Sequence, residues 1–493
     1  MKTESVMRKQ SSLKINVALN IIKTLMGVLF PLITFSYVSR VLGPEGTGKV
    51  SYSISIISYF SIIAGLGIGT YGMREASKIR NNEFELNKFC REIFFINIIS
   101  TCVAYGLLAV VLIFFKSLIE YRALLFICSS TIFFTTIGME WLYSAMEDYL
   151  YITIRSIAFQ ILGIVLLFLM VRDSQDYLQY AFLSVITSVG SNFLNFIHSK
   201  KYINLLRKTP LEIKKHLKPI FILFGTVVAV SLYTVLDTTM IGYFCGDGEV
   251  GIYNAATKST RIVIMVIAAT GTVLAPRLSN YVENDKENYK TLLVKSFNVY
   301  VGFAVPCAVG LYFLARPITL LLCGIKYEAS ISVMKMLAPI VLFVPLGAFF
   351  SDQIFTPMRK DKFSLIPVLI TAVCNIILNL ILIPKYGALG AAFASVIAEI
   401  IVVIIKLILS SGLVKISLLF SNFYQYVIAS MMMFLGLFGL SFVLDMEKTI
   451  SIVLYPLVGA IIYFIVLLLF KNSFVIEVVL SIKNKIGEKI CRK

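Results

Sequence analysis

Long apolar runs, separated by short polar breaks, fill almost the whole chain. Each run is roughly 20 residues or longer, the length that an α-helix needs to cross the hydrocarbon of a bilayer. The breaks contain charged residues, glycine and proline, and none is long enough to hold a folded domain. The pattern predicts fourteen transmembrane helices, at residues 13–38, 50–72, 92–114, 121–144, 150–171, 177–198, 219–244, 254–276, 296–315, 331–354, 363–383, 387–409, 421–444 and 450–470.

The composition agrees with an all-α membrane protein. Of the 493 residues, 58% are hydrophobic and only 15% are charged, whereas about 25% are charged in an ordinary soluble protein. No soluble core could bury this much apolar surface, which excludes soluble enzymes, nucleic-acid-binding proteins and disulfide scaffolds. The eight cysteines form no C-x-x-C pair, and we interpret them as small core residues.

The basic residues indicate how the helices are oriented. The net charge is +18, and most lysines and arginines fall in alternate breaks, as they do in loops on the cytoplasmic side of a membrane. This pattern places both termini in the cytoplasm. The densest basic cluster joins the sixth and seventh predicted helices and consists of Lys200, Lys201, Arg207, Lys208, Lys214, Lys215 and Lys218.

Part of this basic linker has the signature of a helix N-terminus. Thr209 would cap the helix, Pro210 would take its first position, and Glu212 follows the cap by three residues. We predict a short helix on the inner membrane surface as far as Lys218, and a similar one at residues 474–490. A solvated basic linker and tail is the alternative interpretation.

Two glycine-rich turns indicate an internal repeat. Gly43 and Gly48 follow the first predicted helix, Gly246 and Gly251 follow the seventh, and the two glycines of each turn are five residues apart. Because the two turns lie six helices apart, the two halves have the same orientation, and transporters built from such halves hold their substrate between them. We predict a first lobe at residues 1–198, a basic linker at 199–218, a second lobe at 219–411, two further helices within 412–470 and a basic tail at 471–493.

Several segments, taken in order, are similar to a known family. These are Ser39–Gly48 with Gly65–Gly69, Asp237 with Gly251–Tyr253, Leu320–Gly324 with Tyr327, and Pro384–Ala392. Together they resemble Wzx-type polysaccharide repeat-unit flippases, the oligosaccharide flippase family of the multidrug/oligosaccharidyl-lipid/polysaccharide exporter superfamily. The resemblance extends through the twelfth predicted helix.

The resemblance implies both a fold and a function. The implied fold has two pseudo-symmetric six-helix lobes around a central cavity that opens alternately to each side, with two helices appended. The implied function is to move an undecaprenyl-pyrophosphate-linked oligosaccharide from the inner to the outer leaflet of the bacterial cytoplasmic membrane. Glycosyltransferases and a polysaccharide polymerase are the expected protein partners. No cofactor is expected other than Na+ or H+ as a coupling ion.

Four basic residues within the predicted helices are candidates for binding the substrate. Charge within a bilayer is costly and usually functional, and Lys258 and Arg261 share a helix face at a spacing of three residues. With Lys23 of the other lobe they are expected to bind the pyrophosphate, and the family resemblance implies cavity-lining basic residues on these helices. Arg155 is a fourth candidate. The alternative for Lys258 is an acidic partner, or extension of its ammonium group to the interface.

Four oxygen-bearing residues are candidates for a cation site. Asp237, Asn375, Asn379 and Ser395 lie at similar depths in three predicted helices, and the two asparagines share a face. Carboxylate, amide and hydroxyl oxygens suit a hard cation such as Na+. The resemblance implies a cation site at these positions, although some relatives have a second carboxylate where Asn379 stands. Hydrogen bonding between helices is the equally open alternative.

Glu399 lies near the middle of the twelfth predicted helix. We interpret it either as a partner for Lys258 or as a proton relay in the cation-coupling set. Lys335 and Lys406 lie nearer to helix ends, and we expect both to extend their ammonium groups towards the interface.

Two other functions compete with that of a flippase. A multidrug or cation antiporter of the same fold would need an acidic cavity, which the buried basic residues disfavour. A membrane polymerase or ligase would need a large catalytic outer loop, and the longest predicted outer loop, 316–330, is short. The only histidines are His198 and His216 at the inner linker, and the chain has no ATP-binding P-loop motif. We therefore expect a transporter and not an enzyme.

Overall fold

The computed structural model describes residues 13–205, 210–272, 274–443, 451–472 and 475–476. Within these ranges the regular structure is helical and contains no strand. Its main helices are α1 (Leu13–Gly65), α2 (Ile68–Ile79), α3 (Glu83–Phe114), α4 (Arg122–Gly138), α5 (Glu140–Ala145), α6 (Tyr149–Met170), α7 (Tyr177–Val185), α8 (Asn192–His198), α9 (Lys214–Cys245), α10 (Asp247–Thr272), α11 (Ala275–Asn284), α12 (Lys286–Leu322), α13 (Ala329–Leu337), α14 (Ile340–Phe349), α15 (Asp361–Ser411), α16 (Ile416–Leu419), α17 (Phe423–Val443) and α18 (Ser451–Leu469).

Short helical segments join several of these helices. Three are 3-10 turns, η1 (Lys116–Leu118), η3 (Ser199–Lys201) and η4 (Ile325–Tyr327), and two are π-helical, η2 (Ile186–Gly190) and η5 (Phe350–Phe355). Because a π-helical turn interrupts the regular backbone ladder, such turns often mark functional positions in helices.

The chain is a multi-pass membrane protein. A described helix overlaps every predicted transmembrane range, and within the described residues ten continuous helical stretches are long and apolar enough to cross a bilayer. Two of the longest stretches contain a glycine with a positive φ, Gly43 in α1 and Gly387 in α15, and each such glycine divides two predicted helices. The total of fourteen crossings and the cytoplasmic placement of the termini stay predictions.

Local sequence signals explain where some helices begin. The side chain of Asn82 accepts a hydrogen bond from the backbone N–H of Glu85 at the start of α3, whose first turn also contains Glu83. Asp285 caps α12 in the same way. Oxygen acceptors and negative charge at these positions satisfy free N–H groups and complement the positive end of the helix dipole.

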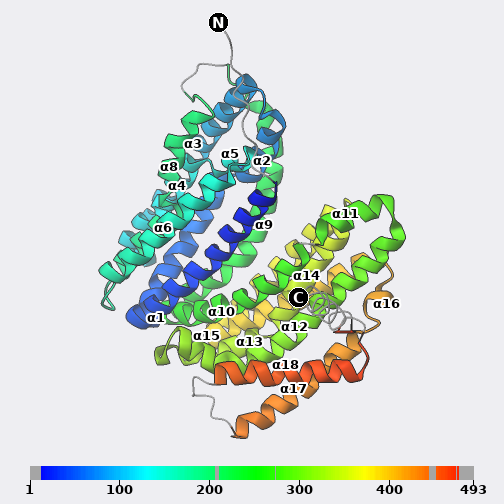
Figure 1. Cartoon of the computed structure of the whole chain (residues 1–493). Coiled ribbons are helices and arrows are strands. Elements are labelled where there is room, and N and C mark those ends of the chain that lie inside the picture. The colour runs from blue at the N-terminus through cyan, green and yellow to red at the C-terminus, as the bar shows by residue number, and fades with distance from the viewer. Residues whose placement is uncertain (1–12, 206–209, 273, 444–450, 473–474, 477–493) are drawn as a thin grey trace, which may run out of the picture. The chain divides into compact units, whose positions relative to one another are not determined.

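The helices form two compact units, which are coloured from blue to green and from green to red in Figure 1. The first unit comprises Met1–Leu42 with Lys49–Ser231, and the second comprises Gly43–Gly48 with Leu232–Lys493. The boundary therefore falls inside α9, whereas the predicted second lobe begins at residue 219.

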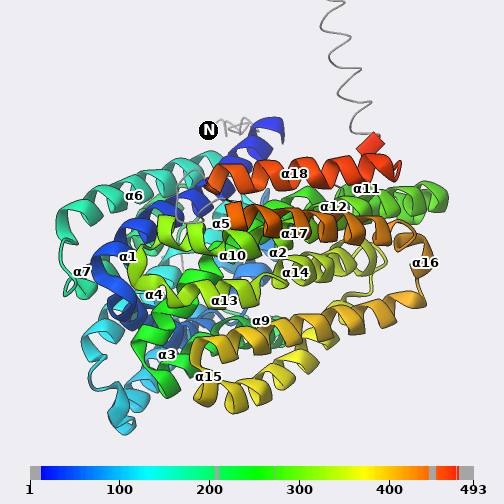
Figure 2. The same ribbon diagram turned by 90° about the horizontal axis from the view of Figure 1, so that it is seen from below.

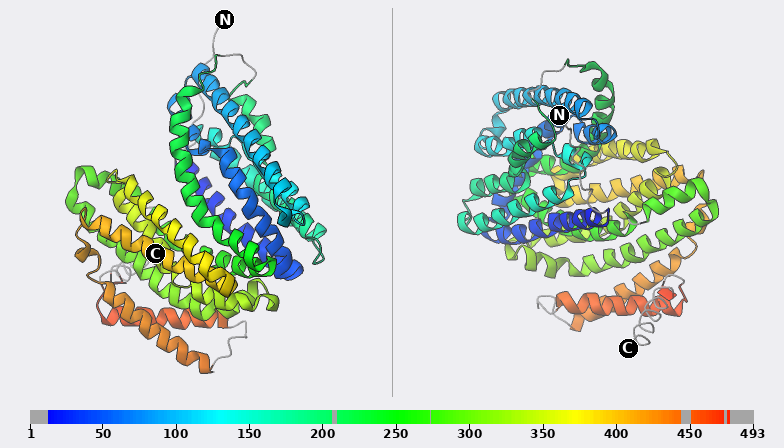
Figure 3. Two further views of the ribbon diagram at one scale, coloured as in Figure 1. Left: turned by 180° about the vertical axis from the view of Figure 1, so that it is seen from behind. Right: turned by 45° about the horizontal axis from the view of Figure 1, so that its top comes forward.

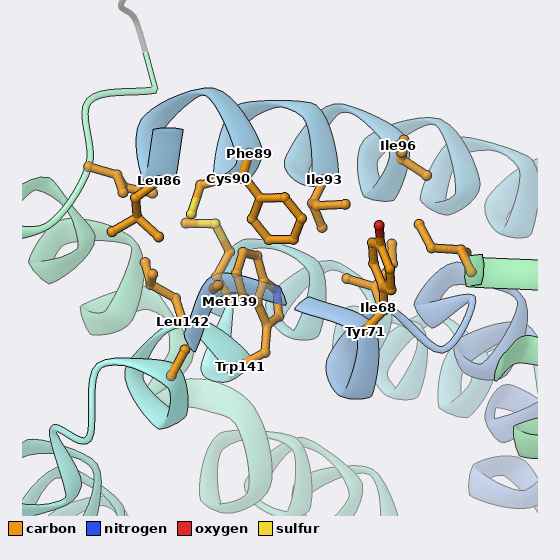
Figure 4. Packing of buried hydrophobic residues seen from close by; sticks show 14 residues of the cluster. Ile68, Tyr71, Leu86, Phe89, Cys90, Ile93, Ile96, Met139, Trp141 and Leu142 are labelled. Carbon is orange, nitrogen blue, oxygen red and sulfur yellow. The ribbon is translucent and has the colours of Figure 1, made fainter. Parts of the chain in front are cut away.

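Aromatic packing holds α2, α3 and α5 together in the first unit. Figure 4 shows Phe89 of α3 against the indole of Trp141, with ring centres 6.0 Å apart and nearly perpendicular. The ring centre of Tyr71 of α2 lies 6.1 Å from that of Phe89. A Cβ atom at Gly72 would lie 2.7 Å from the Trp141 ring, so the absence of a side chain there lets α2 approach α5.

In the second unit, α12 is the helix around which the others pack. It contacts α10, α13 and α14 and also α17 and α18. Figures 2 and 3 show α17 and α18 side by side next to α12. The hydroxyl group of Tyr463 on α18 donates a hydrogen bond of 2.9 Å to the Gly302 carbonyl oxygen of α12, which fixes the appended helices to this unit.

The two repeated glycine turns pack directly against each other within the second unit. Gly43 and Gly246 both have positive φ, at 69° and 87°, a conformation that glycine adopts without strain. A Cβ atom at Gly48 would lie 1.8 Å from the Asp247 carbonyl oxygen, and one at Gly251 would lie 2.1 Å from that of Pro44. Glycine is required at both positions because backbone faces backbone.

The basic linker is anchored to α3 through Glu92 and does not form the predicted surface helix. The buried Glu92 carboxylate accepts a 2.8 Å hydrogen bond from the backbone N–H of Glu212 and lies 2.7 Å from Nε2 of His216. The hydroxyl oxygen of Tyr71 lies 2.8 Å from Nδ1 of the same ring. Residues 210–213 are non-helical and α9 begins at Lys214, so the residues from Lys214 to Lys218 are the first turn of α9 and not a separate helix. Thr209 lies outside the described residues, as does nearly all of the predicted helix at 474–490.

The exposed Glu212 side chain adds two ion pairs to this anchor. Lys88 and Lys215 lie 2.8 Å and 2.9 Å from its carboxylate oxygens, and their hydrogen bonds hold the pKa of that carboxyl at about 2. Because this folded-state pKa lies below the ordinary value of 4.5, the pairs favour the folded state above that pH. Their contribution is lost as the pH falls towards the folded-state value.

Replacement of Gly251 by alanine should destabilise the protein by about 1–3 kcal/mol, since its Cβ would overlap the Pro44 carbonyl and force the backbone apart. Gly248→Ala is the matched control, because a Cβ at that position would meet only Glu45 at 3.9 Å. Thermal unfolding in detergent measures both variants. Equal melting temperatures for Gly251→Ala and Gly248→Ala would contradict the close approach of the turns.

His216→Ala should lower the free energy of unfolding by about 1.5–3 kcal/mol, because it removes a hydrogen bond to a buried carboxylate. Glu212→Gln should have a much smaller effect, since solvent screens its exposed pairs. Denaturant unfolding followed by tryptophan fluorescence reports on this region, because Trp141, the single tryptophan of the chain, packs on Phe89. If Glu212→Gln lowered the free energy of unfolding more than His216→Ala did, the surface ion pairs and not the buried hydrogen bond would anchor the linker.

Candidate functional site

Asp237 lies at the centre of a buried polar cluster in the second unit. Its side chain on α9 is 7% exposed. One carboxylate oxygen accepts hydrogen bonds from Ser395 Oγ at 2.6 Å and Tyr253 Oη at 2.7 Å. The other accepts a bond of 2.6 Å from Asn379 Nδ2. Three helices, α9, α10 and α15, therefore meet at one carboxylate.

The two asparagines extend the cluster along α15. Asn379 Nδ2 also lies 3.0 Å from Asn375 Oδ1, and both side chains are buried. Asn379 Oδ1 is buried without a hydrogen-bond partner among the described residues. A buried acceptor in this position needs an explanation such as an ion or a water molecule.

This donor set fits a hard cation. It offers two carboxylate oxygens, two amide oxygens and two hydroxyl oxygens, which are the ligand types that such ions prefer. The Asn379 amide presents its nitrogen to Asp237, and a 180° turn of this amide would present Oδ1 to Asp237 instead. The hydrogen bonds between helices that formed the alternative interpretation are also present, and the same atoms can serve both roles.

Tyr253 is a member of this cluster that the sequence analysis did not identify as a site residue. It appeared there only within the Gly251–Tyr253 segment. A tyrosine on α10 has no periodicity that distinguishes it from a core residue, and only the crossing of α10 over α9 brings its hydroxyl to Asp237. The other four members, Asp237, Asn375, Asn379 and Ser395, were grouped by their similar depth along their helices and by the family resemblance.

Glu399 lies further along α15, and its charge acts on Lys406. Lys406 is buried, contrary to the expectation that it extends to the interface. Its ammonium group donates hydrogen bonds to the Gly347 carbonyl oxygen at 2.9 Å and to Ser351 Oγ at 2.7 Å. The physical reason is that a buried ammonium group needs hydrogen-bond acceptors, and these two oxygens provide them within the protein.

Lys258 and Arg261 occupy neighbouring positions on α10 in the second unit. Lys258 is partly buried and Arg261 is exposed, and the two charges are close enough to repel each other. Arg261 is also among the charges that act on the Asp237 carboxylate. Arg261 therefore lies within electrostatic range of both Lys258 and the polar cluster.

The other two predicted basic residues belong to the first unit. Lys23 lies on α1 in a stretch whose side chains are outside the described residues, so its meeting with Lys258 and Arg261 stays a prediction. Arg155 on α6 is 6% exposed. Its Nη1 is 3.5 Å from Asn192 Oδ1, its guanidinium lies over the Tyr151 ring at 5.9 Å, and its Nε has no hydrogen-bond partner among the described residues.

An apolar cavity lies between α12 and the two appended helices. Its volume is about 320 Å³, and its walls are formed mainly by α12 and α18, with Val263 of α10 and Met433 of α17. The walls include Phe303, Pro306, Leu311 and Phe464. A cavity with such walls suits a hydrocarbon chain and offers little to a polar molecule.

Comparison with known proteins places this arrangement in a family. The sequence matches the polysaccharide biosynthesis protein family over residues 13–282 and the MatE family over residues 223–384. It is 23% identical to a putative O-antigen transporter of Shigella dysenteriae, over 77% of this chain and 95% of that protein. It is 21% identical to the probable low-salt glycan biosynthesis flippase Agl15 of Haloferax volcanii, over 48% of this chain and 51% of that protein.

The fold is similar to that of a solved flippase structure. The lipid II flippase MurJ, in an inward closed conformation, matches with a TM-score of 0.74 and 20% sequence identity. The match covers 93% of this chain and all of that structure. The resemblance to Wzx-type flippases is thus confirmed, and the chain belongs to the polysaccharide biosynthesis protein family.

Proposed function

We propose that this protein is a flippase for a lipid-linked oligosaccharide. Its substrate is an undecaprenyl-pyrophosphate-linked repeat unit of a surface polysaccharide, which it moves from the inner to the outer leaflet of the bacterial cytoplasmic membrane. The observation that carries the proposal is the family match across residues 13–282. The names of the relatives, an O-antigen transporter and a glycan flippase, support the same substrate class.

The basic residues of both units bind the charged part of the substrate in this proposal. Lys23 of α1 and the pair Lys258 and Arg261 of α10 neutralise the pyrophosphate, with the planar guanidinium of Arg261 able to form two parallel hydrogen bonds. Arg155 is a further anion-binding group within the first unit. The apolar cavity beside α12 accommodates part of the prenyl chain. Alternating access of the two units then exposes the substrate to each side in turn.

The membrane potential and an ion gradient provide the driving force. Two negative charges that move outward across 100 mV, inside negative, gain about 4.6 kcal/mol, from about 2.3 kcal/mol per charge. Cations of the protein that move with the substrate reduce this gain. Inward Na+ or H+ bound at Asp237, with Asn375, Asn379 and Ser395, supplies a second source of free energy. Glu399 is the remaining acid in this coupling set. Glycosyltransferases and a polymerase are the proposed neighbours in the membrane.

A cation antiporter is the second candidate, because the MatE family matches residues 223–384. The Asp237 cluster is compatible with either function. Lys258 and Arg261 favour the flippase, since positive charge in the substrate path repels an organic cation. A polymerase or ligase is disfavoured because the relatives are transporters and flippases.

Arg261→Ala should slow lipid flipping by about tenfold or more, because a charge-assisted hydrogen bond contributes about 1.5–3 kcal/mol. The measurement uses proteoliposomes that carry a fluorescent polyprenyl-pyrophosphate oligosaccharide in one leaflet. Arg316→Ala is the control, since Arg316 forms an exposed pair with Glu328 at 3.1 Å. If the protein exported an organic cation and did not move the lipid, the proposed function would be that of an antiporter and not of a flippase.

Asp237→Asn should abolish the dependence of flipping on a Na+ or H+ gradient and leave potential-driven flipping in place. The variant preserves the shape of the side chain and removes the charge that a cation requires. Asp352 is an exposed acid on η5, and Asp352→Asn serves as the control. Flipping by Asp237→Asn that still responds to both ion gradients would assign the cluster to helix packing alone.

A further inference from the structure

A second and larger cavity lies at the opposite end of the second unit from the repeated glycine turns. Its volume is about 630 Å³, and three segments that the charge pattern places on the cytoplasmic side line it. These are the end of α11 with the start of α12, the turn after η5, and the link from α15 to α16. The walls are largely aliphatic and include Val282, Leu293, Val294, Leu413 and Leu418.

Three lysines border this apolar cavity. Lys286 and Lys290 lie one turn apart on α12, and Lys415 lies immediately before α16. All three are exposed. None of them forms an ion pair with a carboxylate in the part of the chain that the structure describes.

Two of the acids near these lysines in sequence have other partners, and the third, Glu287, does not line the cavity. Glu283 forms an ion pair of 2.7 Å with Arg359. Asp285 caps α12 and accepts hydrogen bonds from the backbone N–H groups of Glu287 and Asn288. The cavity mouth therefore keeps an excess of positive charge next to hydrocarbon walls.

We propose that this cavity binds an anionic phospholipid. The phosphate group would lie among Lys286, Lys290 and Lys415, and an acyl chain would pack against Leu293 and the aliphatic wall. A basic pocket between transmembrane helices on the cytoplasmic side is a typical place for such a headgroup. A soluble phosphate would leave the apolar wall unused, and a zwitterionic lipid would leave the positive charge unbalanced.

The C-terminal residues of the chain itself are a poorer occupant. They lie outside the described residues, and their sequence is basic, so the three lysines would repel them. The basic residues in this segment are Lys483, Lys485, Lys489, Arg492 and Lys493.

The position of the cavity gives the lipid a structural role. Leu418 and Leu419 of α16 form part of the wall opposite Leu293 of α12, and α16 contacts both α12 and α15. A lipid bound here braces the link that leads from α15 to the appended helix α17. This role is separate from transport of the substrate, so its failure would not affect the proposed flippase function.

The test is lipid binding to the full-length protein in neutral detergent, measured by native mass spectrometry and by thermal unfolding. Dioleoyl phosphatidylglycerol should bind and raise the melting temperature, whereas dioleoyl phosphatidylcholine and inorganic phosphate should not. The triple variant Lys286→Gln, Lys290→Gln, Lys415→Gln should bind phosphatidylglycerol at least tenfold more weakly. Leu418→Gln should weaken binding as well, because it places an amide on the acyl-chain wall.

A charge-matched control separates a built site from general attraction. Lys116→Gln, Lys362→Gln and Lys385→Gln remove three exposed lysines elsewhere and should leave phosphatidylglycerol affinity unchanged. Equal losses in the two triple variants, or equal affinity for phosphatidylcholine, would overturn the proposal. Tighter binding of undecaprenyl pyrophosphate than of phosphatidylglycerol at these lysines would also overturn it, and would assign the cavity to the substrate lipid.

Discussion

Hydrocarbon offers no hydrogen bonds, and this constraint decides most of the structure. A polar group without a partner costs several kcal/mol in the bilayer, so the backbone must form helices. The same requirement acts on side chains. Asp237 reaches three donors from neighbouring helices, and Lys406 reaches a carbonyl and a hydroxyl group. These two buried groups thereby connect neighbouring helices and set their positions along one another. Apolar packing alone would not set those positions.

Glycine allows the backbone to turn and approach where the helices meet. The turns at Gly43 and Gly246 use the left-handed conformation, and Gly48 and Gly251 allow two backbones to pack without intervening side chains. Such contacts are rigid because no flexible atom lies between them. The repeated turns thus form a fixed end in the second unit, from which α9 leads to Asp237 and α10 to Tyr253 and Arg261.

The polar cluster and the basic pair lie close enough in the second unit to influence each other. Arg261 acts on the Asp237 carboxylate, and a cation bound at that carboxylate would compete with the arginine for it. If the proposed function is right, this arginine would then be available to the pyrophosphate. Ion binding and substrate binding would in that case be coupled through one side chain, because opposite charges within a membrane attract strongly at short range.

The sequence by itself determined the helical membrane class and where the apolar helices lie, because these depend on local composition and on length. Depth along the predicted helices, together with the family resemblance, grouped Asp237, Asn375, Asn379 and Ser395. Tertiary structure alone decided that Tyr253 completes this cluster, that Lys406 is buried against Gly347 and that His216 joins Glu92. These contacts depend on which faces of distant helices meet. When a helix is apolar on every side, its hydrophobic periodicity does not indicate how the helix is rotated about its own axis.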